Sequence, residues 1–467
     1  MNPDVDPYAS LIEIGRRIQQ RQITSLAVTE AMLARIEPLQ PRLHAYATVA
    51  GESARQAAAQ ADEEIAAGRI RGPLHGVPIA VKDLADTAGI PTAGGMPLNR
   101  DRIPAQDATV IARFKAAGAV LLGKLQMTEG AFSGHHPDID APVNPWHEAL
   151  WPGVSSSGSG VATAAGLCYG SIGSDTLGSI RFPCTMNGVT GLKPTWGRVS
   201  RAGVLPLAES MDHVGPMARS AADAAALLAA IAGADPADPT AAREPVPDYL
   251  RALQAGVGGL RIGVDRAAIG QHAEAAVGQV CDAAAAVFAS LGVEIVPLQL
   301  PDMTQMAEDA LQHCVAECAL AHERTYPSQR DAYGPVLSSL IEAGLKVDAR
   351  SLLRIENRRA EFTGRVQALF GQVDLLLIPA MNRAAPTLAD LAAQTTDLAA
   401  RMARLYFTAP FDMSRSPTLT LPGGQTAAGS PIGFQLVGGH FDEARLLAAG
   451  HAFQQSTDWH LRRPAGI

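Results

Sequence analysis

The pattern of hydrophobic and polar positions predicts helices at the start of the chain. Residues 1–65 have the character of helical segments rather than strands. Ser10 is expected to cap a helix that runs through Gln22, and Ser25 to cap a second helix that ends near Pro38. The chain is therefore predicted to open with helices.

A strand pattern follows in GVPIAVKD (76–83), because Val77, Ile79 and Val81 alternate with smaller residues. The other predicted elements are helices over 109–117, 157–169 and 274–291, strands over 119–124, 261–265, 293–300, 373–380, 418–422 and 431–438, and a long loop over 130–153. Strands that alternate with helices predict an α/β fold, with a large mixed β-sheet and helices on both faces.

The best linker candidate is GADPADPTAAREPVPD (233–248), which is rich in proline and alanine. Strand patterns continue on both sides of it, so it is expected to cross the surface rather than to separate two domains. The sequence thus predicts one domain over 1–467, with a variable region that forms the substrate pocket at about 300–400.

Composition excludes several classes of protein. The chain has 467 residues, is 47% hydrophobic and has a net charge of −8. No basic stripe appears, so nucleic-acid binding is not expected. The opening MNPDVDPY has no apolar core, which argues against a signal peptide, and the apolar run 224–234 is too short to cross a bilayer. A soluble, cytoplasmic protein that does not bind membranes is expected.

The five cysteines are scattered and odd in number, which does not fit a disulfide framework. Cys314 and Cys318, together with His313, have the residue types of a metal site, but no second cluster completes a tetrahedron. Buried thiols in a helix are the favoured interpretation. The pair His135 and His136 also lacks partners at metal spacing, so neither a metal nor a cofactor is expected.

Two serine-rich segments are candidates for chemistry. WPGVSSSGSG (151–160) has no strand directly before it, so it does not fit the nucleophile elbow of α/β-hydrolases. In GSIGSDTLGSIRFP (170–183), consecutive backbone N–H groups of a tight loop can converge on an anion. Taken alone, that segment is equally a plain turn, and the local sequence favours the turn.

The motifs taken together indicate a protein family more specifically than either serine-rich segment does alone. VKD, PGVSSSGSGVATAAG, GSDTLGSIRFP, NGVTGLKPTWGRVS and ESMDHVGPMARS, in this order, resemble the amidase signature family. The resemblance is strongest in the core motif region 76–220. It extends more weakly to SPTLTLPGG and SPIGFQLVGGHFDEARLL near the end of the chain.

The resemblance implies a Ser–cis-Ser–Lys triad with Ser179 as nucleophile, Ser155 as bridging serine and Lys82 as base. It also implies an oxyanion hole made of backbone N–H groups. The residues of that hole would be Thr176, Leu177, Gly178 and Ser179, and the supporting residues would be Ser156, Asp175 and Arg181. Asp212 and His213 lie in a matching segment and are interpreted as loop architecture, with no role as a base.

A lysine has a pKa of about 10.4, so Lys82 needs a pKa about 3 units lower to act as a base near neutral pH. Burial can lower it, and the apolar residues before Lys82 fit a buried strand end. Asp83 would oppose the shift, but neighbouring residues of a strand point to opposite faces. Without the resemblance, a surface lysine would be the favoured interpretation.

One residue departs from the family pattern. Leu177 stands where the family usually has glycine. Its N–H remains available, but a leucine disfavours positive φ and adds an apolar group beside the nucleophile. The acyl side of the pocket is therefore expected to be narrower or more hydrophobic.

The pocket is expected to form from the 130–151 loop and from a helix around 303–317. The candidate lining residues are Gly130, Ala131, Phe132, His135 and Trp146. They include no arginine cluster, which predicts a neutral, fairly hydrophobic amide or carbamate (an aryl amide or urethane), with esterase side activity. The alternatives are a non-catalytic binding protein on the same fold and one chain of a glutamine-dependent tRNA amidotransferase, and a homodimer stays open.

Overall fold

The computed structural model describes residues 5–393 and 397–467. The strands are β1 (Tyr46–Val49), β2 (Pro78–Lys82), β3 (Val120–Leu125), β4 (Gly170–Asp175), β5 (Thr190–Lys193), β6 (His213–Ala218), β7 (Arg261–Val264), β8 (Glu294–Pro297), β9 (Leu375–Pro379), β10 (Thr418–Gln425) and β11 (Pro431–Gly438). Within the described residues they form one sheet of eleven strands in the order β1-β3-β2-β4-β6-β5-β10-β11-β9-β7-β8. Parallel pairs at β2–β3, β2–β4, β7–β8 and β7–β9 make it a mixed sheet, as predicted.

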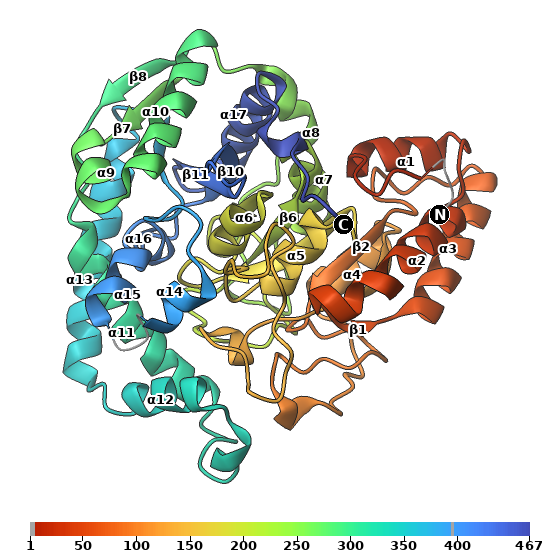
Figure 1. The fold of residues 1–467 in the computed structure, drawn as a ribbon, viewed down its shortest axis with the longest axis horizontal. Coiled ribbons are helices and arrows are strands. Elements are labelled where there is room, and N and C mark those ends of the chain that lie inside the picture. The colour runs from red at the N-terminus through yellow and green to blue at the C-terminus, as the bar shows by residue number, and fades with distance from the viewer. Residues whose placement is uncertain (1–4, 394–396) are drawn as a thin grey trace.

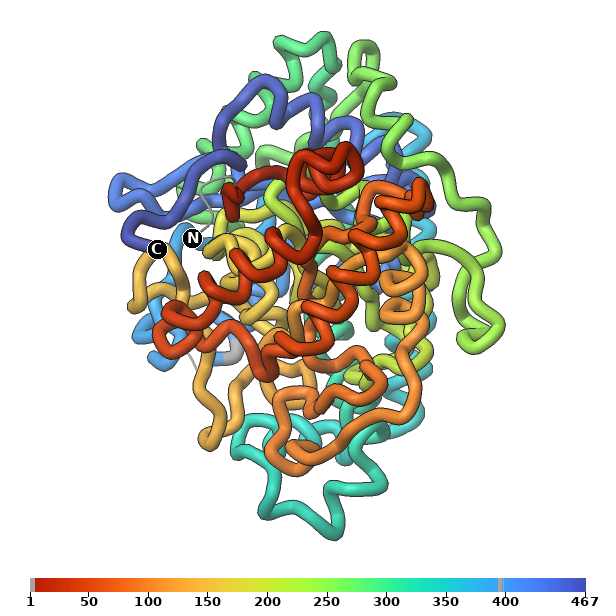
Figure 2. Tube along the Cα trace, turned by 90° about the vertical axis from the view of Figure 1, so that its right-hand side faces the viewer, coloured from red at the N-terminus to blue at the C-terminus, as the bar shows by residue number. Residues whose placement is uncertain are grey.

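Helices surround this sheet (Figure 1). They are α1 (Leu11–Gln19), α2 (Ser25–Leu43), α3 (Gly51–Ala66), α4 (Thr109–Ala116), α5 (Ser157–Ala164), α6 (Arg181–Asn187), α7 (Ala221–Ile231), α8 (Tyr249–Ala252), α9 (Arg266–His272), α10 (Ala275–Ser290), α11 (Met303–Ala321), α12 (Pro335–Gly344), α13 (Ala349–Leu369), α14 (Leu388–Ala393), α15 (Leu398–Leu405), α16 (Ala409–Met413) and α17 (Glu443–Gln455). The N-terminal helices α1 to α3 lie at the right-hand end of the molecule in Figure 1, and Figure 2 looks onto that end.

Two neighbouring residues of β11 show that helices cover both faces of the sheet. The ring of Phe434 lies 5.0 Å, centroid to centroid, from that of Phe453 on α17. A Cβ atom at Gly433 would lie 3.1 Å from the hydroxyl of Thr185 on α6. Because successive residues of a strand point to opposite faces, α17 and α6 lie on opposite faces of the sheet. This arrangement confirms the predicted fold class.

The first helices begin close to where the sequence predicts. Ser10 caps α1, and its Oγ accepts the N–H of Glu13 at 3.1 Å. The predicted cap of α2 is wrong by one residue, because Thr24 is the cap and the hydroxyl of Ser25 instead donates to Gly76 O at 2.7 Å.

The predicted end of α2 near Pro38 is also wrong, because the helix continues to Leu43. A proline inside a helix removes one backbone hydrogen bond. Leu39 and Leu43, which follow that proline, are both buried in the core, so packing compensates for the lost bond.

The segment GSIGSD is the most consequential strand that the sequence did not predict. It forms β4, in which every residue is buried and which pairs with β2 on one side and β6 on the other. Its small and polar residues have low strand propensity, so tertiary burial decides its conformation. Because the chain has to enter this strand, α5 ends at Ala164 rather than near Tyr169. The chain then turns at Gly166, where φ is 65°.

The candidate linker 233–248 is tied to the rest of the molecule. Asp235 accepts hydrogen bonds from the hydroxyls of Thr109 and Ser200, at 2.6 and 2.5 Å.

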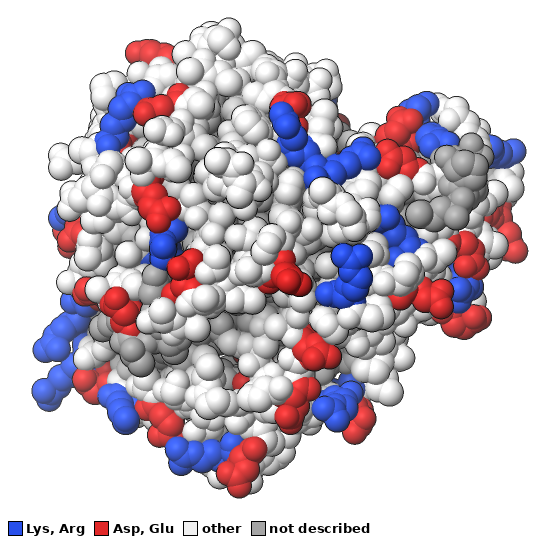
Figure 3. Space-filling model, in the orientation of Figure 1, with Lys and Arg blue, Asp and Glu red and all other residues white. Residues whose placement is uncertain are grey.

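On the face that Figure 3 shows, basic and acidic side chains are interspersed over a largely uncharged surface. Among the described helices, none has both the length and the apolar character needed to cross a membrane.

Candidate active site

Lys82 ends strand β2 in the middle of the parallel part of the sheet, between β3 and β4. Its side chain is fully buried. The Nζ atom donates hydrogen bonds to Ser155 Oγ at 2.6 Å and to Ser174 Oγ at 2.9 Å. The ammonium group is thus held by two hydroxyls from two different elements.

Burial lowers the pKa of Lys82 to about 7, although the negative charges of Asp175 and Asp212 oppose the shift. The neighbour Asp83 turns away, and its Oδ1 lies 3.6 Å from Nζ of Lys124. The expectation that Asp83 faces the other side of the strand is therefore confirmed. At neutral pH a substantial fraction of Lys82 carries a free amine lone pair.

Ser155 lies just before α5, and its side chain is fully buried. The Val154–Ser155 peptide bond is cis. The carbonyl of Ser155 accepts the N–H of Thr128 at 3.2 Å. At Gly153, where φ is 81°, a Cβ atom would lie 2.5 Å from the backbone of Pro183, so this turn requires glycine.

Ser156 connects the serine run to the second serine segment. Its N–H donates to Ser179 O at 3.3 Å. Its hydroxyl donates to Ser174 O at 3.1 Å and accepts the N–H of Ser174 at 3.2 Å. These contacts hold β4 and the turn before α6 against the start of α5.

Ser174 is a site residue that the sequence did not reveal. It reaches Lys82 because β4 lies parallel to β2, with Ala80 opposite Ser171 and Val81 opposite Ile172. A prediction of β4 as a strand would have been needed to find it.

Ser179 lies just before α6 and is 9% exposed. It lines a cavity of about 630 Å³, which places it where a ligand can reach it. Lys82, Ser155 and Ser174 form the hydrogen-bonded set behind it, and Ser156 links that set to Ser179. The three residues of the expected triad therefore come from three separate segments, of which Lys82 and Ser155 are hydrogen-bonded to each other and Ser179 is joined to them through the backbone of Ser156.

The turn before Ser179 is organised by the carboxylate of Asp175, which accepts the N–H groups of Gly178 at 2.8 Å and Ile180 at 2.9 Å. The prediction that Gly178 offers its N–H to an oxyanion is therefore wrong in this structure, because that N–H is already bound. Three N–H groups of the predicted set donate to no acceptor within residues 5–393 and 397–467. They belong to Thr176, Leu177 and Ser179.

The turn accommodates Leu177 without positive φ. Gly178 is the residue with positive φ (134°), and a Cβ atom there would lie 2.5 Å from the ring of Phe182. Leu177 instead presents its side chain to the cavity, and its carbonyl accepts the hydroxyl of Thr408 at 2.7 Å. The departure from the family pattern thus changes the wall of the cavity and leaves the required glycine in place.

Arg181 is fully buried and donates hydrogen bonds to the carboxyl groups of two aspartates. Its Nε and Nη2 donate to Asp175 at 3.0 and 2.7 Å, and Nη2 also donates to Asp412. Nη1 donates to Thr408 O at 2.7 Å. The arginine joins the turn to α16, more than two hundred residues away in sequence.

The two aspartates differ in the direction of their pKa shifts. Burial raises the pKa of an aspartate, but Arg181 and the N–H donors outweigh burial at Asp175 and hold its pKa well below the usual range. At Asp412 burial dominates, and its pKa lies well above the usual range. The two carboxyl groups that share the Arg181 guanidinium therefore have pKa values shifted in opposite directions.

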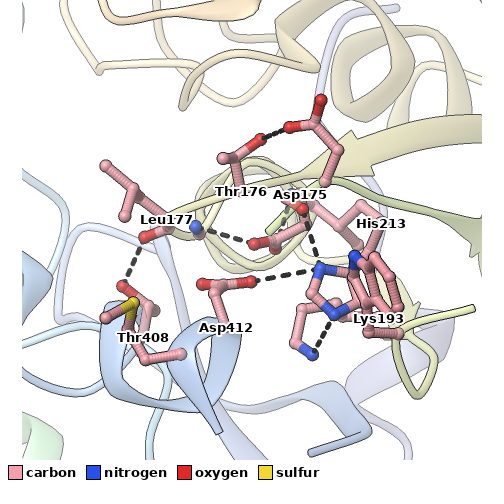
Figure 4. A network of polar contacts seen from close by, with 12 residues as sticks. Asp175, Thr176, Leu177, Lys193, His213, Thr408 and Asp412 are labelled. Carbon is pink, nitrogen blue, oxygen red and sulfur yellow. Dashed lines mark hydrogen bonds and ion pairs between the residues drawn. The ribbon is translucent and has the colours of Figure 1, made fainter. Parts of the chain in front are cut away.

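His213 opens strand β6, so the expectation of loop architecture at this residue is wrong. Its Nδ1 lies 3.1 Å from Asp175 O and its Nε2 lies 3.3 Å from Lys193 Nζ (Figure 4). Burial and the charge of Lys193 hold the pKa of His213 well below its usual range. A neutral imidazole in these contacts supports the backbone, and Asp212 beside it accepts the Thr176 hydroxyl at 2.6 Å.

Some of the predicted pocket residues line the cavity and some do not. Ala131, Phe132 and His135 lie in its wall. Trp146 does not, because its indole N–H donates to Asn187 O at 2.9 Å and its ring lies against Gly188. Gly130 is also absent from the wall. A Cβ atom there would face Leu337 and His322.

His135 is held in the wall by Ser157, whose Oγ lies 3.1 Å from Nε2. Burial lowers the pKa of His135 to about 4. It is therefore neutral at physiological pH and offers the cavity a polar but uncharged group.

The expectation that the pocket contains no arginine cluster is wrong. Arg401 and Arg404, both on α15, line the cavity together with Ser179. The predicted walls were the 130–151 loop and the 303–317 helix, but α15 joins the cavity from a distant part of the chain. The charge of the pocket therefore differs from the prediction.

The chain is similar to known proteins along nearly its whole length. The family model described as Amidase matches residues 27–447. The chain is 49% identical over 466 residues to AmiD of Mycobacterium tuberculosis, whose name assigns it to the amidases, with 99% of this chain and 97% of that protein covered. It is 37% identical over 485 residues to a glutamyl-tRNA(Gln) amidotransferase chain of Methylococcus capsulatus, with 98% and 99% covered. The solved structure of native peptide amidase from Stenotrophomonas maltophilia matches with a TM-score of 0.84 at 31% identity, over 98% of this chain and 99% of that one.

Proposed function

Since this chain belongs to the amidase family, we propose that it cleaves the C–N bond of a hydrophobic amide or carbamate with Ser179 as nucleophile, Ser155 as proton relay and Lys82 as base. The observation that carries the proposal is the contact between Lys82 and Ser155, 2.6 Å long and closed to solvent. Lys82 has a pKa of about 7, which suits a group that gains and loses a proton at neutral pH.

In the proposed first step, Ser179 Oγ forms a bond to the carbonyl carbon of the substrate. Its proton passes to Ser155 Oγ while the proton of Ser155 passes to the free amine of Lys82. The carbonyl oxygen becomes an oxyanion, for which the unoccupied N–H groups of Thr176, Leu177 and Ser179 are the candidate donors. One such donor contributes about 3 kcal/mol to lowering the barrier.

In the second step the same relay runs in reverse. Lys82 returns a proton through Ser155 to the nitrogen of the leaving amine, and the C–N bond breaks as the carbonyl reforms. The product at this stage is an acyl- or carbamoyl-enzyme on Ser179. Water then attacks that carbonyl, and its proton passes to Lys82 by the same path. As the C–O bond to Ser179 breaks, Lys82 returns a proton through Ser155 to Ser179 Oγ, and the carboxylic or carbamic acid is released.

The cavity supports a hydrophobic substrate. Its walls include Phe132, Leu177, Phe182, Leu207 and Leu340, and a volume of about 630 Å³ lies within the range of sites for small organic ligands. An aryl amine as leaving group fits such walls. Esters of similar shape are also expected to react, because their alkoxide leaves more easily than an amine.

Labelling with a fluorophosphonate probe, read out by mass spectrometry, tests the proposal directly. We expect one adduct on Ser179 and none in Ser179→Ala. Ser339→Ala is the matched control, because Ser339 also lines the cavity but has no contact with Lys82. A folded wild-type protein without an adduct on Ser179 would contradict the nucleophile and favour a non-catalytic binding protein.

The identity to the amidotransferase chain supports a second candidate, release of ammonia from glutamine within a complex. The two functions differ in what the isolated chain does. Hydrolysis of a 4-nitroanilide by the purified chain supports the free amidase. Glutaminase activity that appears only with added partner proteins would support the amidotransferase.

A further inference from the structure

Two arginine side chains border the cavity that contains Ser179. Arg401 and Arg404 lie three residues apart on α15, so they are neighbours on the same face of that helix. Both line the cavity. A ligand that reaches Ser179 therefore shares its space with two positive charges.

Neither charge is neutralised by another described residue. In the described part of the chain, the side chains of Arg401 and Arg404 have no carboxylate at ion-pair distance and no hydrogen-bond acceptor. The neighbouring Arg383, by contrast, contacts Glu274 at 3.0 Å. Glu148 is also in the cavity wall, yet it forms no ion pair with a described residue.

The environment of Arg404 disfavours an unpaired charge. Burial lowers its pKa, and the positive charges of Arg401 and Arg383 lower it further. Desolvating a guanidinium without an acceptor is costly, so a negatively charged group that entered here would relieve that cost.

Arg404 is also held in a defined position. Its guanidinium lies 5.6 Å from the centroid of the Trp151 ring, in a cation–π contact. Trp151 packs on Phe182 with 5.8 Å between ring centroids, and Phe182 lies on α6, which begins just after Ser179. The aromatic pair thus connects the arginine to the helix that follows the nucleophile.

We propose that the cavity selects amides that carry a carboxylate at the far end of an apolar or aryl spacer, with the carboxylate bound by Arg404 and Arg401 and the scissile amide at Ser179. A planar guanidinium binds a carboxylate through two parallel hydrogen bonds, which gives both affinity and orientation. The spacer lies along the apolar part of the wall, formed by Leu177, Leu207, Leu311 and Leu405. This inference rests on the proposed hydrolysis at Ser179 and narrows its substrate class.

The test compares 4-nitroanilides of dicarboxylic acids (glutaric, adipic and suberic) with those of the matching alkanoic acids, which lack the second carboxylate. We expect wild-type kcat/KM to favour the anionic substrate by about tenfold or more at one spacer length. Arg404→Gln should abolish that preference, mainly through KM, and Arg404→Lys should retain part of it. Arg365→Gln removes an equal charge from the exposed surface of α13 and should leave the ratio unchanged.

A binding measurement separates this inference from the proposed reaction. Calorimetry with 4-phenylbutyrate should show binding that is weakened about tenfold by Arg404→Gln, while 4-phenylbutanamide should bind both proteins equally. If the fluorophosphonate labels Ser179 but neither the kinetic nor the binding preference appears, the carboxylate site is wrong and the hydrolase stands. If labelling and turnover fail while binding still depends on Arg404, the carboxylate site stands and the reaction does not.

Discussion

Lys82 Nζ and Ser155 Oγ lie 2.6 Å apart, and neither side chain is exposed to solvent. A buried ammonium group loses its hydration, and the two hydroxyls around Nζ are neutral, so they replace that hydration only in part. The pair therefore combines a lysine that releases its proton near neutral pH with a hydroxyl that can pass it on.

The first prediction concerns the pH dependence of turnover. Because Lys82 acts as a base only when deprotonated, kcat/KM should rise with pH and reach half its plateau at about pH 7. Lys82→Met should lower kcat by about a thousandfold or more. The measurement is 4-nitroanilide hydrolysis across the pH range, with the surface variant Lys115→Met as control. A near-normal rate in Lys82→Met would place the base elsewhere.

The second prediction concerns stability. The folded protein holds Lys82 at a pKa of about 7, below the value of about 10.4 for an unfolded chain. Between these pH values the unfolded state binds the extra proton, so the free energy of unfolding should increase with pH over that window. Urea unfolding at several pH values should show this rise in wild type and a flatter dependence in Lys82→Met. Equal slopes would mean that Lys82 is charged in the folded protein at these pH values.

The third prediction concerns Ser174, which accepts the second hydrogen bond of Lys82 at 2.9 Å. Ser174→Ala removes an acceptor that favours the ammonium form, so the acidic limb of the pH profile should move to lower pH. It should also lower kcat by about tenfold, because Nζ loses one of its two fixed partners. Ser171→Ala, a buried serine on the same strand, is the control and should leave the limb in place. If the acidic limb of the pH profile is unchanged in Ser174→Ala, Ser174 has only a packing role.

The sequence predicts those site residues that lie in recognisable local motifs. It misses the residues that reach the site only through long-range packing. Lys82, Ser155 and Ser179 could be found because their motifs resemble a known family, and the apolar strand before Lys82 fits the burial that a base requires. Ser174 lies in a segment of small polar residues that becomes a strand only through burial. Arg404 reaches the cavity from far along the chain, and no local pattern marks such a contact.

The fourth prediction compares the two aspartates that share Arg181. Asp175 is charged and binds both the guanidinium and backbone N–H groups, so Asp175→Asn should destabilise the protein by about 3–5 kcal/mol and abolish activity. Burial raises the pKa of Asp412 and so disfavours its charged form, and Asp412→Asn should therefore cost less than Asp175→Asn, about 1 kcal/mol. Urea unfolding at neutral pH measures both. Equal losses would show that Asp412 carries a charge as well.

The last prediction concerns the acyl side of the cavity. Leu177 lies in the cavity wall two residues before Ser179, and its backbone does not need glycine because Gly178 carries the positive φ. Leu177→Gly, and also Leu177→Ala, should therefore open the wall without removing the N–H groups of the turn. We expect kcat/KM for bulky benzoyl anilides to rise about tenfold relative to acetyl anilides.

Leu340→Ala serves as the control for that change, because it removes a similar volume from a cavity wall on α12, away from the turn at Ser179. It should enlarge the cavity without altering the preference between benzoyl and acetyl groups. If Leu177→Ala leaves the acyl profile unchanged, or if Leu340→Ala changes it equally, Leu177 does not limit the acyl group. Its place in the turn would then reflect only its contact with Thr408.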